Sequence, residues 1–327
     1  MRVKIRGIEV YHPDNKVDNE FYIEHFKKQG KDIKGLLKAL GRKERYIINN
    51  NKDNTLTMGI KAVTKLLENE KLKGEDIDLI IYSSQFPEYT LPTQASIIHG
   101  IIDGNKNAMC QDINVNCIGM VVALDNASRQ LLSNNNFKRA LIIGSDYSSI
   151  HCNPDDENTY PLFGDCACAM IIEKTDEENV GFIDSFYESE SSIIEKVLFP
   201  ANGASKSYKT DDYNRKIKWE QFDASFVFQH IIHSYKTLIT RNSLKEDVDK
   251  FCLSQFTDGF SKGVSEMINR PKEDFIYIGD KYGYTGTSSP FIALYEGLKS
   301  GQIKKGDKVF IWSIAIGWTT CAALVQV

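Results

Sequence analysis

The two halves of this chain repeat one order of sequence features, and this repeat is the strongest constraint on its fold. In Glu75–Phe86 an acidic turn, an apolar strand and the tripeptide Ser-Gln-Phe follow one another, and the same order returns in Glu246–Phe256. Each half also ends in a strand of small residues, at Cys166–Ile172 and at Cys321–Val325. An offset of about 170 residues, roughly half the chain, is typical of a duplicated structural unit.

The alternation of strands and amphipathic helices predicts the α/β fold class. Lys138–Gly144 and Lys308–Trp312 have the composition of buried strands, and Ser225–Thr240 has the periodicity of a helix. Such alternation builds layers of helices packed against sheets. Together with the repeat, it predicts two duplicated α/β halves, residues 1–174 and 175–327.

The composition excludes several classes of function. The chain has 42% hydrophobic and 26% charged residues and a formal net charge of −4, with no basic tract, so we predict no nucleic-acid partner. It has no uninterrupted apolar run long enough to cross a membrane, so we predict no membrane partner. Its N-terminus has the pattern of a strand rather than of a signal peptide. We therefore expect a cytoplasmic protein.

The seven cysteines show no paired spacing, which is typical of free thiols in a reducing compartment. Cys166 and Cys168 lie on one face of a predicted strand, but no second pair of ligands accompanies them. We interpret them as small buried residues and predict no metal site.

Cys117 stands apart from the other cysteines because it lies where a short apolar strand turns through Gly119 into a predicted helix. Val121, Leu124 and Leu131 follow at helical spacing. At the N-terminus of a helix, the dipole and the free backbone N–H groups stabilise a thiolate. The sequence thus predicts a nucleophile for covalent acyl transfer, whereas an inert core cysteine is the alternative.

The chain resembles the thiolase superfamily, and within it the ketoacyl-acyl-carrier-protein synthase III family. The resemblance covers nearly the whole length and rests on five segments that occur in the family's order. These are Gly41–Tyr46, Tyr89–Pro92, Phe163–Ala169, Lys304–Val309 and Ile316–Leu324. It implies a thiolase-like fold in which the two halves form five layers, α-β-α-β-α. It also implies a homodimer without a resident cofactor, with an acyl-CoA or acyl-carrier-protein thioester as substrate.

In such enzymes the cysteine takes the acyl group, and a histidine and an asparagine then stabilise the enolate formed when a malonyl thioester loses carbon dioxide. Here Ser254 stands at the histidine position, followed by Gln255, and Tyr284 stands at the asparagine position. Serine and tyrosine do not titrate near neutral pH as histidine does. We expect these three residues to line a rebuilt polar site that does not favour the usual decarboxylative condensation.

The resemblance places two further features. The oxyanion hole for acyl loading would use the backbone N–H groups of Cys117 and Ile316. Leu91 occupies the position of a residue that reaches across the dimer interface into the neighbour's acyl pocket, where it would act as a gate on acyl length. The alternative for Leu91 is a loop leucine packed against its own domain.

The leading hypothesis is therefore acyl transfer through an acyl-Cys117 thioester in lipid or secondary-metabolite synthesis, of the kind found in fatty-acid biosynthesis. If a histidine replaces the missing base, His151 and His230 are the candidates. A second hypothesis is a non-catalytic scaffold subunit that completes the pocket of a paralogous ketosynthase. The family's coenzyme A contacts are replaced at Gly35, Ala39 and Glu157, which weakens carrier recognition.

Overall fold

The computed structural model describes residues 1–207, 215–244 and 248–327. The stretch Asn202–Lys218 has the polar composition of a surface excursion, and residues 208–214 of it lie outside the described residues, as does Glu246 of the sequence repeat. Within the described part, no helix is long and apolar enough to cross a membrane.

The first sheet has five strands and belongs to the N-terminal half. In spatial order they are β1 (Arg2–Tyr11), β7 (Cys166–Thr175), β6 (Arg139–Asp146), β4 (Leu79–Ser83) and β5 (Met109–Ile113). β7 pairs antiparallel with both β1 and β6, whereas β4 pairs parallel with both β6 and β5. Its apolar residues are buried on both faces, as expected for a sheet covered by helices on each side.

The second sheet repeats this arrangement with four strands. Their spatial order is β8 (Gly181–Ser189), β13 (Thr319–Gln326), β12 (Lys308–Ala315) and β11 (Lys250–Leu253). Neighbouring strands pair parallel or antiparallel in the same sequence as in the first sheet, so β8, β13, β12 and β11 correspond to β1, β7, β6 and β4. The counterpart of β5 is reduced to a single parallel bridge between Phe251 and Phe275. The two halves therefore share one strand topology, in agreement with the sequence repeat.

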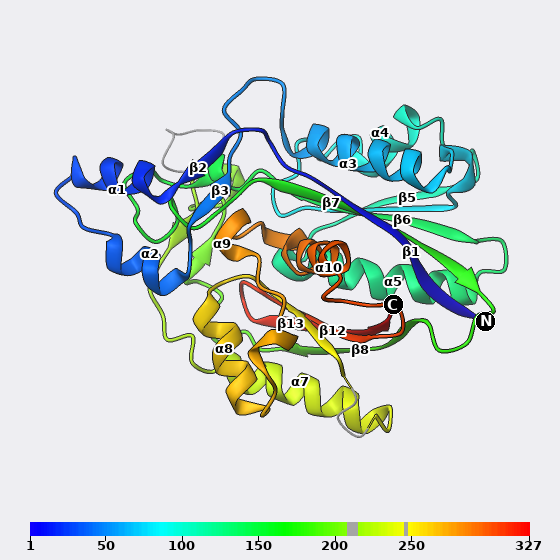
Figure 1. The fold of residues 1–327 in the computed structure, drawn as a ribbon. Coiled ribbons are helices and arrows are strands. Elements are labelled where there is room, and N and C mark those ends of the chain that lie inside the picture. The colour runs from blue at the N-terminus through cyan, green and yellow to red at the C-terminus, as the bar shows by residue number, and fades with distance from the viewer. Residues whose placement is uncertain (208–214, 245–247) are drawn as a thin grey trace.

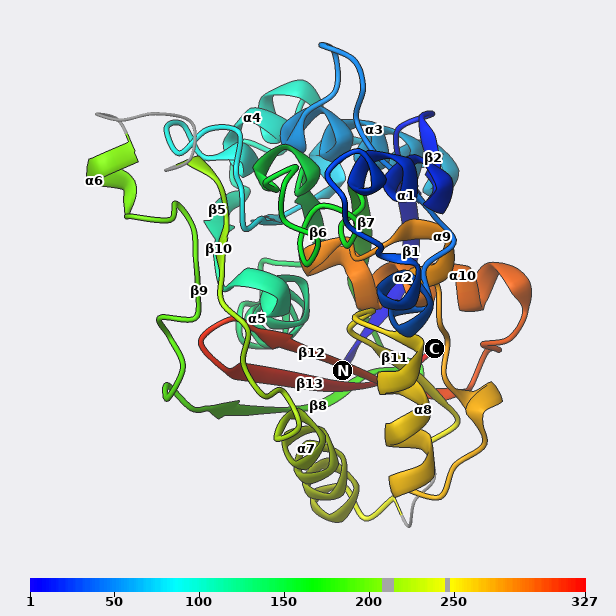
Figure 2. The ribbon, with the colours of Figure 1, turned by 90° about the vertical axis from the view of Figure 1, so that its left-hand side faces the viewer.

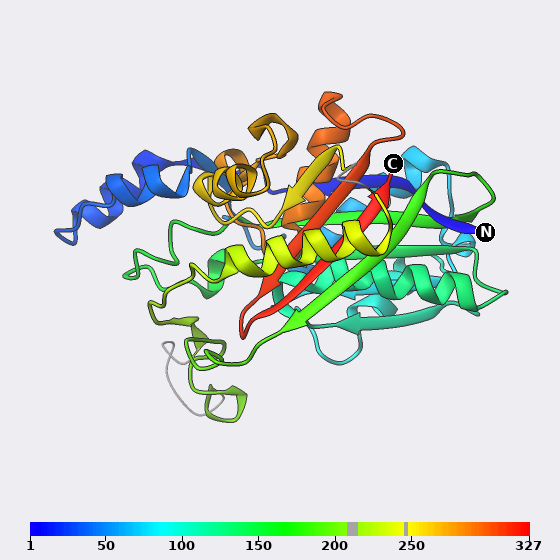
Figure 3. The same ribbon diagram turned by 90° about the horizontal axis from the view of Figure 1, so that it is seen from below.

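The sheets and helices form five layers, as Figure 1 shows from top to bottom. The outer layers are α3 (Thr55–Glu70) with α4 (Gln94–Ile101), and α7 (Val227–Arg241) with α8 (Asp258–Met267). The central layer holds α5 (Gly119–Ser133) and α10 (Ser289–Ser300), which pack against both sheets. Seen from below, α7 lies across the strands of the second sheet (Figure 3). The predicted thiolase-like α/β fold in five layers is confirmed.

Shorter elements form an extension at one end of the layers, visible in Figure 2. They are β2 (Lys16–Asp18), α1 (Asn19–Lys27), α2 (Lys34–Leu40), β3 (Glu44–Tyr46), β9 (Val197–Leu198), α6 (Ala204–Ser207), β10 (Lys218–Trp219) and α9 (Gly279–Tyr282). β2 pairs with β3, and β9 pairs with β10. Residues of α2 and of the β9–β10 ribbon reach the region in front of Cys117, so this extension encloses the candidate site.

Candidate active site

Cys117 lies in a 3₁₀ turn (Asn116–Ile118) that joins the end of β5 to the start of α5. Asn116 adopts a left-handed backbone conformation with φ of 53°, which bends the chain sharply before the cysteine. α5 is buried almost all round because it lies between the two sheets. The junction expected from the sequence therefore exists, and it holds the thiol at the centre of the molecule.

The electrostatic expectation for Cys117 is corrected by the structure. The residue is only 3% exposed, and this burial raises the pKa of its thiol to about 12. The free energy lost when a thiolate is removed from water is larger than the stabilisation that the first turn of α5 provides. The resting group is consequently a neutral thiol at neutral pH rather than a thiolate.

The thiol contacts a side chain that the sequence did not single out. Cys117 Sγ donates to Oε1 of Gln85 at 3.3 Å, and Nε2 of Gln85 donates to Oδ2 of Asp146 at 3.0 Å. Asp146 is fully buried and also accepts from Ser84 Oγ and from the backbone N–H groups of Gln85 and Thr287. Burial raises the pKa of the Asp146 carboxyl despite these four donors. Gln85 belongs to the first Ser-Gln-Phe of the repeat, which is the signal that could have pointed to it.

Tyr284 and Ser254 contact each other, but only Tyr284 lines the pocket of Cys117, which corrects the expectation that Ser254 lines it. The hydroxyl groups of the two residues lie 3.3 Å apart, and both side chains are buried. Of the two, Tyr284 lines the pocket of Cys117 directly, whereas Ser254 lies behind it.

Gln255 does not line this pocket, which corrects the expectation from the sequence. Its Nε2 donates to the carbonyl oxygens of Leu253 and Ile276, and its Oε1 accepts from the N–H groups of Ile278 and Gly279. Both polar atoms of its side chain are therefore used to join the end of β11 to the start of α9 and the residues before it. Gln85 and Gln255 occupy matching places in the repeat, but only Gln85 contacts the thiol.

Leu91 lies outside the cavities next to Cys117 and is 87% exposed. The alternative of a leucine packed against its own domain is therefore wrong. A role as a gate in a neighbouring subunit stays a prediction.

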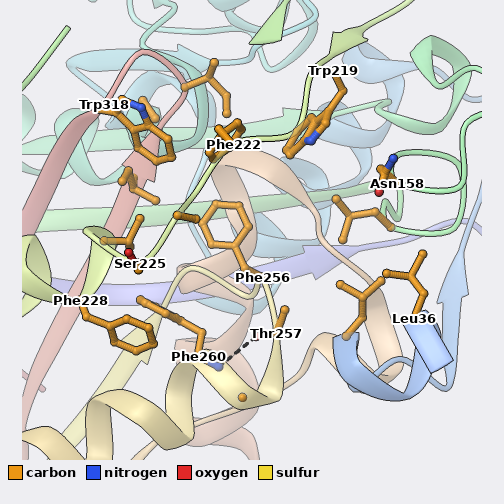
Figure 4. Close-up of a pocket in the computed structure, with 18 residues that line it drawn as sticks. Leu36, Asn158, Trp219, Phe222, Ser225, Phe228, Phe256, Thr257, Phe260 and Trp318 are labelled. Atoms are coloured by element: carbon orange, nitrogen blue, oxygen red, sulfur yellow. Dashed lines mark hydrogen bonds between the residues drawn. The ribbon is translucent and has the colours of Figure 1, made fainter. Parts of the chain in front are cut away.

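Two adjoining cavities lie in front of the thiol. The smaller, of about 120 Å³, is lined by Cys117 and Tyr284 together with Gln85, Phe86, Asn114, Asn116, Phe163, Val197, Leu198, Phe199, Ile217, Trp219, Phe256 and Ile316. The larger, of about 550 Å³, shares Trp219, Phe256 and Ile316 with it. Figure 4 shows aromatic side chains from several elements gathered around the larger cavity, with Leu36 of α2 on its far side. Among the described residues, no charged side chain lines either cavity.

Ile316 lies in the turn between β12 and β13, on the wall shared by the two cavities. The turn is closed by a hydrogen bond from the Trp318 N–H to the Ala315 carbonyl at 3.1 Å, and Gly317 takes a φ of 86°. The structure thus brings Ile316 to the pocket of Cys117. Donation from its N–H to a substrate oxyanion stays a prediction.

Neither candidate histidine lines the pocket. His151 packs against Phe86 and Phe199, with ring centroids at 4.5 Å from each, and these two phenylalanines stand between it and the pocket. Burial lowers the pKa of His151 to about 4. His230 on α7 pairs with Glu188 at 3.1 Å. In the described part of the chain, no histidine takes the place of the family's base, and no cluster of side chains could hold a metal ion.

Comparison with known proteins identifies relatives of the whole chain. The family model of 3-oxoacyl-[acyl-carrier-protein (ACP)] synthase III matches residues 111–191, and the model of its C-terminal part matches residues 239–327. The chain is 31% identical to beta-ketoacyl-[acyl-carrier-protein] synthase III of Clostridium perfringens over 329 aligned positions, which cover 99% of this chain and 98% of the relative. The chain belongs to the 3-oxoacyl-[acyl-carrier-protein] synthase III family.

Other members of the synthase III family are similar over the same length. The protein of that name from Azobacteroides pseudotrichonymphae is 28% identical, and the match covers 98% of this chain and 96% of the relative. The crystal structure of the Aquifex aeolicus synthase III superposes with a TM-score of 0.86 at 24% identity, covering 99% of this chain and 100% of that one. This last likeness shows that the synthase III fold is preserved from end to end.

Proposed function

We propose that this protein is an acyltransferase that carries an acyl group on Cys117. The sulfur takes the acyl group from a thioester of coenzyme A or of an acyl carrier protein and passes it to an acceptor. The observation that carries this proposal is the position of the thiol in a small pocket that adjoins a larger uncharged cavity. A thiol in a small pocket can receive an acyl group there, and the adjoining larger cavity offers space for a second substrate.

Acyl loading by this site is an exchange between a thiol and a thioester. The S–H bond of Cys117 and the C–S bond of the donor break, a new C–S bond forms at Cys117, and the proton ends on the sulfur of the departing carrier. The tetrahedral intermediate would hold its oxyanion against the backbone N–H groups of Cys117 and Ile316, which removes the need for a charged side chain.

The acceptor is proposed to be an amine, alcohol or thiol rather than a malonyl carbanion. Decarboxylation produces an enolate, and the synthase III relatives are named for making ketoacyl products. In this chain the corresponding positions carry the buried hydroxyls of Ser254 and Tyr284. Neutral hydroxyls stabilise an enolate less than a group that can become positively charged. The uncharged lining of the larger cavity favours an acceptor that enters without a carboxylate next to the thioester.

A non-catalytic scaffold subunit is the second candidate. It is favoured by the high pKa of the Cys117 thiol, which keeps the nucleophile neutral at rest. In that case the chain would form a complex with a paralogous ketosynthase instead of a homodimer. The retention of an accessible pocket in front of the thiol supports the enzyme over the scaffold.

Intact-mass analysis after incubation with a panel of acyl-coenzyme A and acyl-carrier thioesters tests this proposal. We expect a mass increase of one acyl group that is absent in Cys117→Ala. Cys152→Ala is the matched control, because Cys152 is buried in the same apolar cluster but does not line the pocket. The mass increase of Cys152→Ala should equal that of the parent protein.

The other outcomes decide between the candidates. If no donor gives an adduct and a paralogous ketosynthase copurifies with the protein, the proposal of an enzyme is overturned in favour of a scaffold subunit. Release of carbon dioxide from a malonyl thioester after loading would show condensation and overturn the proposed choice of acceptor.

A further inference from the structure

Four side-chain and backbone groups form a line of hydrogen bonds that runs from the Tyr284 hydroxyl to the Cys117 carbonyl. The Tyr284 hydroxyl lies 3.3 Å from Ser254 Oγ, and Ser254 Oγ lies 3.3 Å from Ser313 Oγ. Ser313 Oγ donates to the Cys117 carbonyl oxygen at 2.9 Å. Tyr284 and the Cys117 thiol line the same small pocket, so this network links a side chain of the pocket wall to the backbone of Cys117.

The number of hydroxyl protons in this hydrogen-bond network limits the directions in which its hydrogen bonds can run. The Cys117 carbonyl can only accept, so Ser313 Oγ is the donor to it. Ser254 Oγ is the acceptor in its contact with Ser313 Oγ, which leaves the Tyr284 hydroxyl as the partner for the single Ser254 proton, and in that contact either oxygen can be the donor. When Ser254 donates to Tyr284, the phenolic proton of Tyr284 is free to point at the sulfur.

The phenol ring of Tyr284 is held firmly enough to serve as a fixed donor. Phe256 stacks on it with ring centroids 4.6 Å apart, and Phe163 packs on it at 5.7 Å. Its backbone N–H donates to the Leu162 carbonyl, and its carbonyl accepts from the Gly164 N–H. A donor whose position is set before the reaction loses no freedom when charge develops.

We propose that the Tyr284 hydroxyl is a catalytic hydrogen-bond donor to the Cys117 sulfur, with Ser254 and Ser313 as the positioning residues that set its direction. The role rests on the proposed acyl transfer, in which the sulfur is negatively charged during attack and again when it leaves. Tyr284 donates without giving up its proton, so no atoms are added to the exchange described above.

Two further observations support a donor rather than a base. Burial, followed by the nearby Cys117, raises the pKa of Tyr284 well above its ordinary value, so the phenol keeps its proton. Cys117 and Tyr284 are the titratable side chains among the described residues that line the small pocket. Asp146, behind Gln85, is the carboxyl that faces them, and its charge opposes a thiolate. In such surroundings a neutral O–H dipole has a large effect on a developing anion.

The rate at which iodoacetamide alkylates Cys117 between pH 7 and 10 tests this role without any acyl donor. We expect Tyr284→Phe, which keeps the ring, to lower the rate constant at pH 8 on the order of tenfold and to move the pH profile upward by about one unit. The alkylation rate constant of Ser254→Ala should lie between those of the parent protein and Tyr284→Phe, because Tyr284 then loses the neighbour that directs its proton. Labelled peptides identified by mass spectrometry restrict the measurement to Cys117.

The sign of the change separates a catalytic donor from a structural residue. A variant that merely loosened the pocket would expose the thiol and react faster. A profile for Tyr284→Phe that superimposes on that of the parent protein, or lies above it, would overturn the proposal. If Tyr284→Phe does not fold, Ser254→Ala and Ser313→Ala provide the same test, and unchanged profiles in both would overturn it.

The outcome is independent of the acyl-loading experiment. Failure of every acyl donor would leave the alkylation result standing as a property of the thiol. An unaltered Tyr284→Phe profile would remove only the role of the tyrosine and would leave acyl loading by Cys117 in place.

Discussion

The Cys117 sulfur lies 3.3 Å from the side-chain oxygen of Gln85, and this contact ties the thiol to the interior of the protein. The same amide donates to the buried carboxyl of Asp146, which also accepts from the Thr287 N–H in the second half of the chain. Cys117 therefore lies at one of the places where the two duplicated halves are joined by hydrogen bonds. Its surroundings serve the stability of the fold as well as any chemistry.

Replacement of Gln85 by leucine should destabilise the protein. Asp146 would lose one donor while staying buried, which costs about 2 kcal/mol of the free energy of unfolding at pH 7.5. Because burial holds the folded-state pKa of Asp146 above its unfolded value, the loss should shrink as the pH falls and the carboxyl becomes protonated. Urea unfolding of the variant at several pH values measures both effects. Gln302→Leu, on the surface, is the control, and equal losses in the two variants would contradict the assigned role of Gln85.

Removal of the backbone donor at Ile316 should slow acyl loading. Ile316→Pro deletes one N–H of the proposed oxyanion hole, which typically lowers the rate on the order of 10²-fold. Alkylation of Cys117 by iodoacetamide forms no oxyanion and should be unchanged, which controls for damage to the turn. Ile316→Ala keeps the N–H and should load normally. Stopped-time mass spectrometry of the acyl adduct gives the rates, and equal loading by the proline variant would exclude this donor.

Replacement of His151 by phenylalanine should change acid stability. The folded-state pKa of His151 is lowered to about 4, so the unfolded chain takes up a proton first as the pH falls below its ordinary value near 6.5. The stability contributed by the neutral ring is therefore fully present above pH 6.5 and is lost towards pH 4, by about 3 kcal/mol in total.

His151→Phe should lack this loss, because phenylalanine does not titrate. The measurement is the free energy of unfolding of both proteins between pH 4 and 8, and their difference isolates His151 from the other groups. Acyl loading at pH 8 should be equal in the two proteins. A large loss of loading in the variant would show that His151 acts in catalysis after all.

Leu91→Asp should weaken self-association. An apolar side chain that is 87% exposed in one chain is a candidate for burial against a second copy. A charge at a buried interface position should raise the dissociation constant of the homodimer on the order of tenfold or more. Sedimentation velocity at several concentrations provides the measurement. Met267→Asp, also at an exposed apolar residue, is the control, and equal behaviour of both variants would remove Leu91 from the interface.

The sequence alone was sufficient for the fold class, the repeat and the position of Cys117. These features depend on local patterns: apolar strands such as Leu79–Ser83, their order along the chain, and a cysteine where β5 gives way to α5. The approach of Tyr284 to Ser254 was also expected, because both residues stand at positions that the family resemblance brings together.

The tertiary structure decided what surrounds the thiol. Gln85 is 32 residues from Cys117 in the sequence and Ser313 is 196 residues away. The Ser-Gln-Phe repeat draws attention to Gln85 but does not predict its contact with the thiol, and Ser313 belongs to no pattern that predicts its contact. The structure also reversed the expected charge of the cysteine. A helix N-terminus favours a thiolate, but that favourable effect is local, whereas the cost of desolvation depends on how completely the rest of the chain excludes water from the sulfur. The strand–turn–helix pattern could place the nucleophile, but its state of protonation follows from packing that only the folded chain creates.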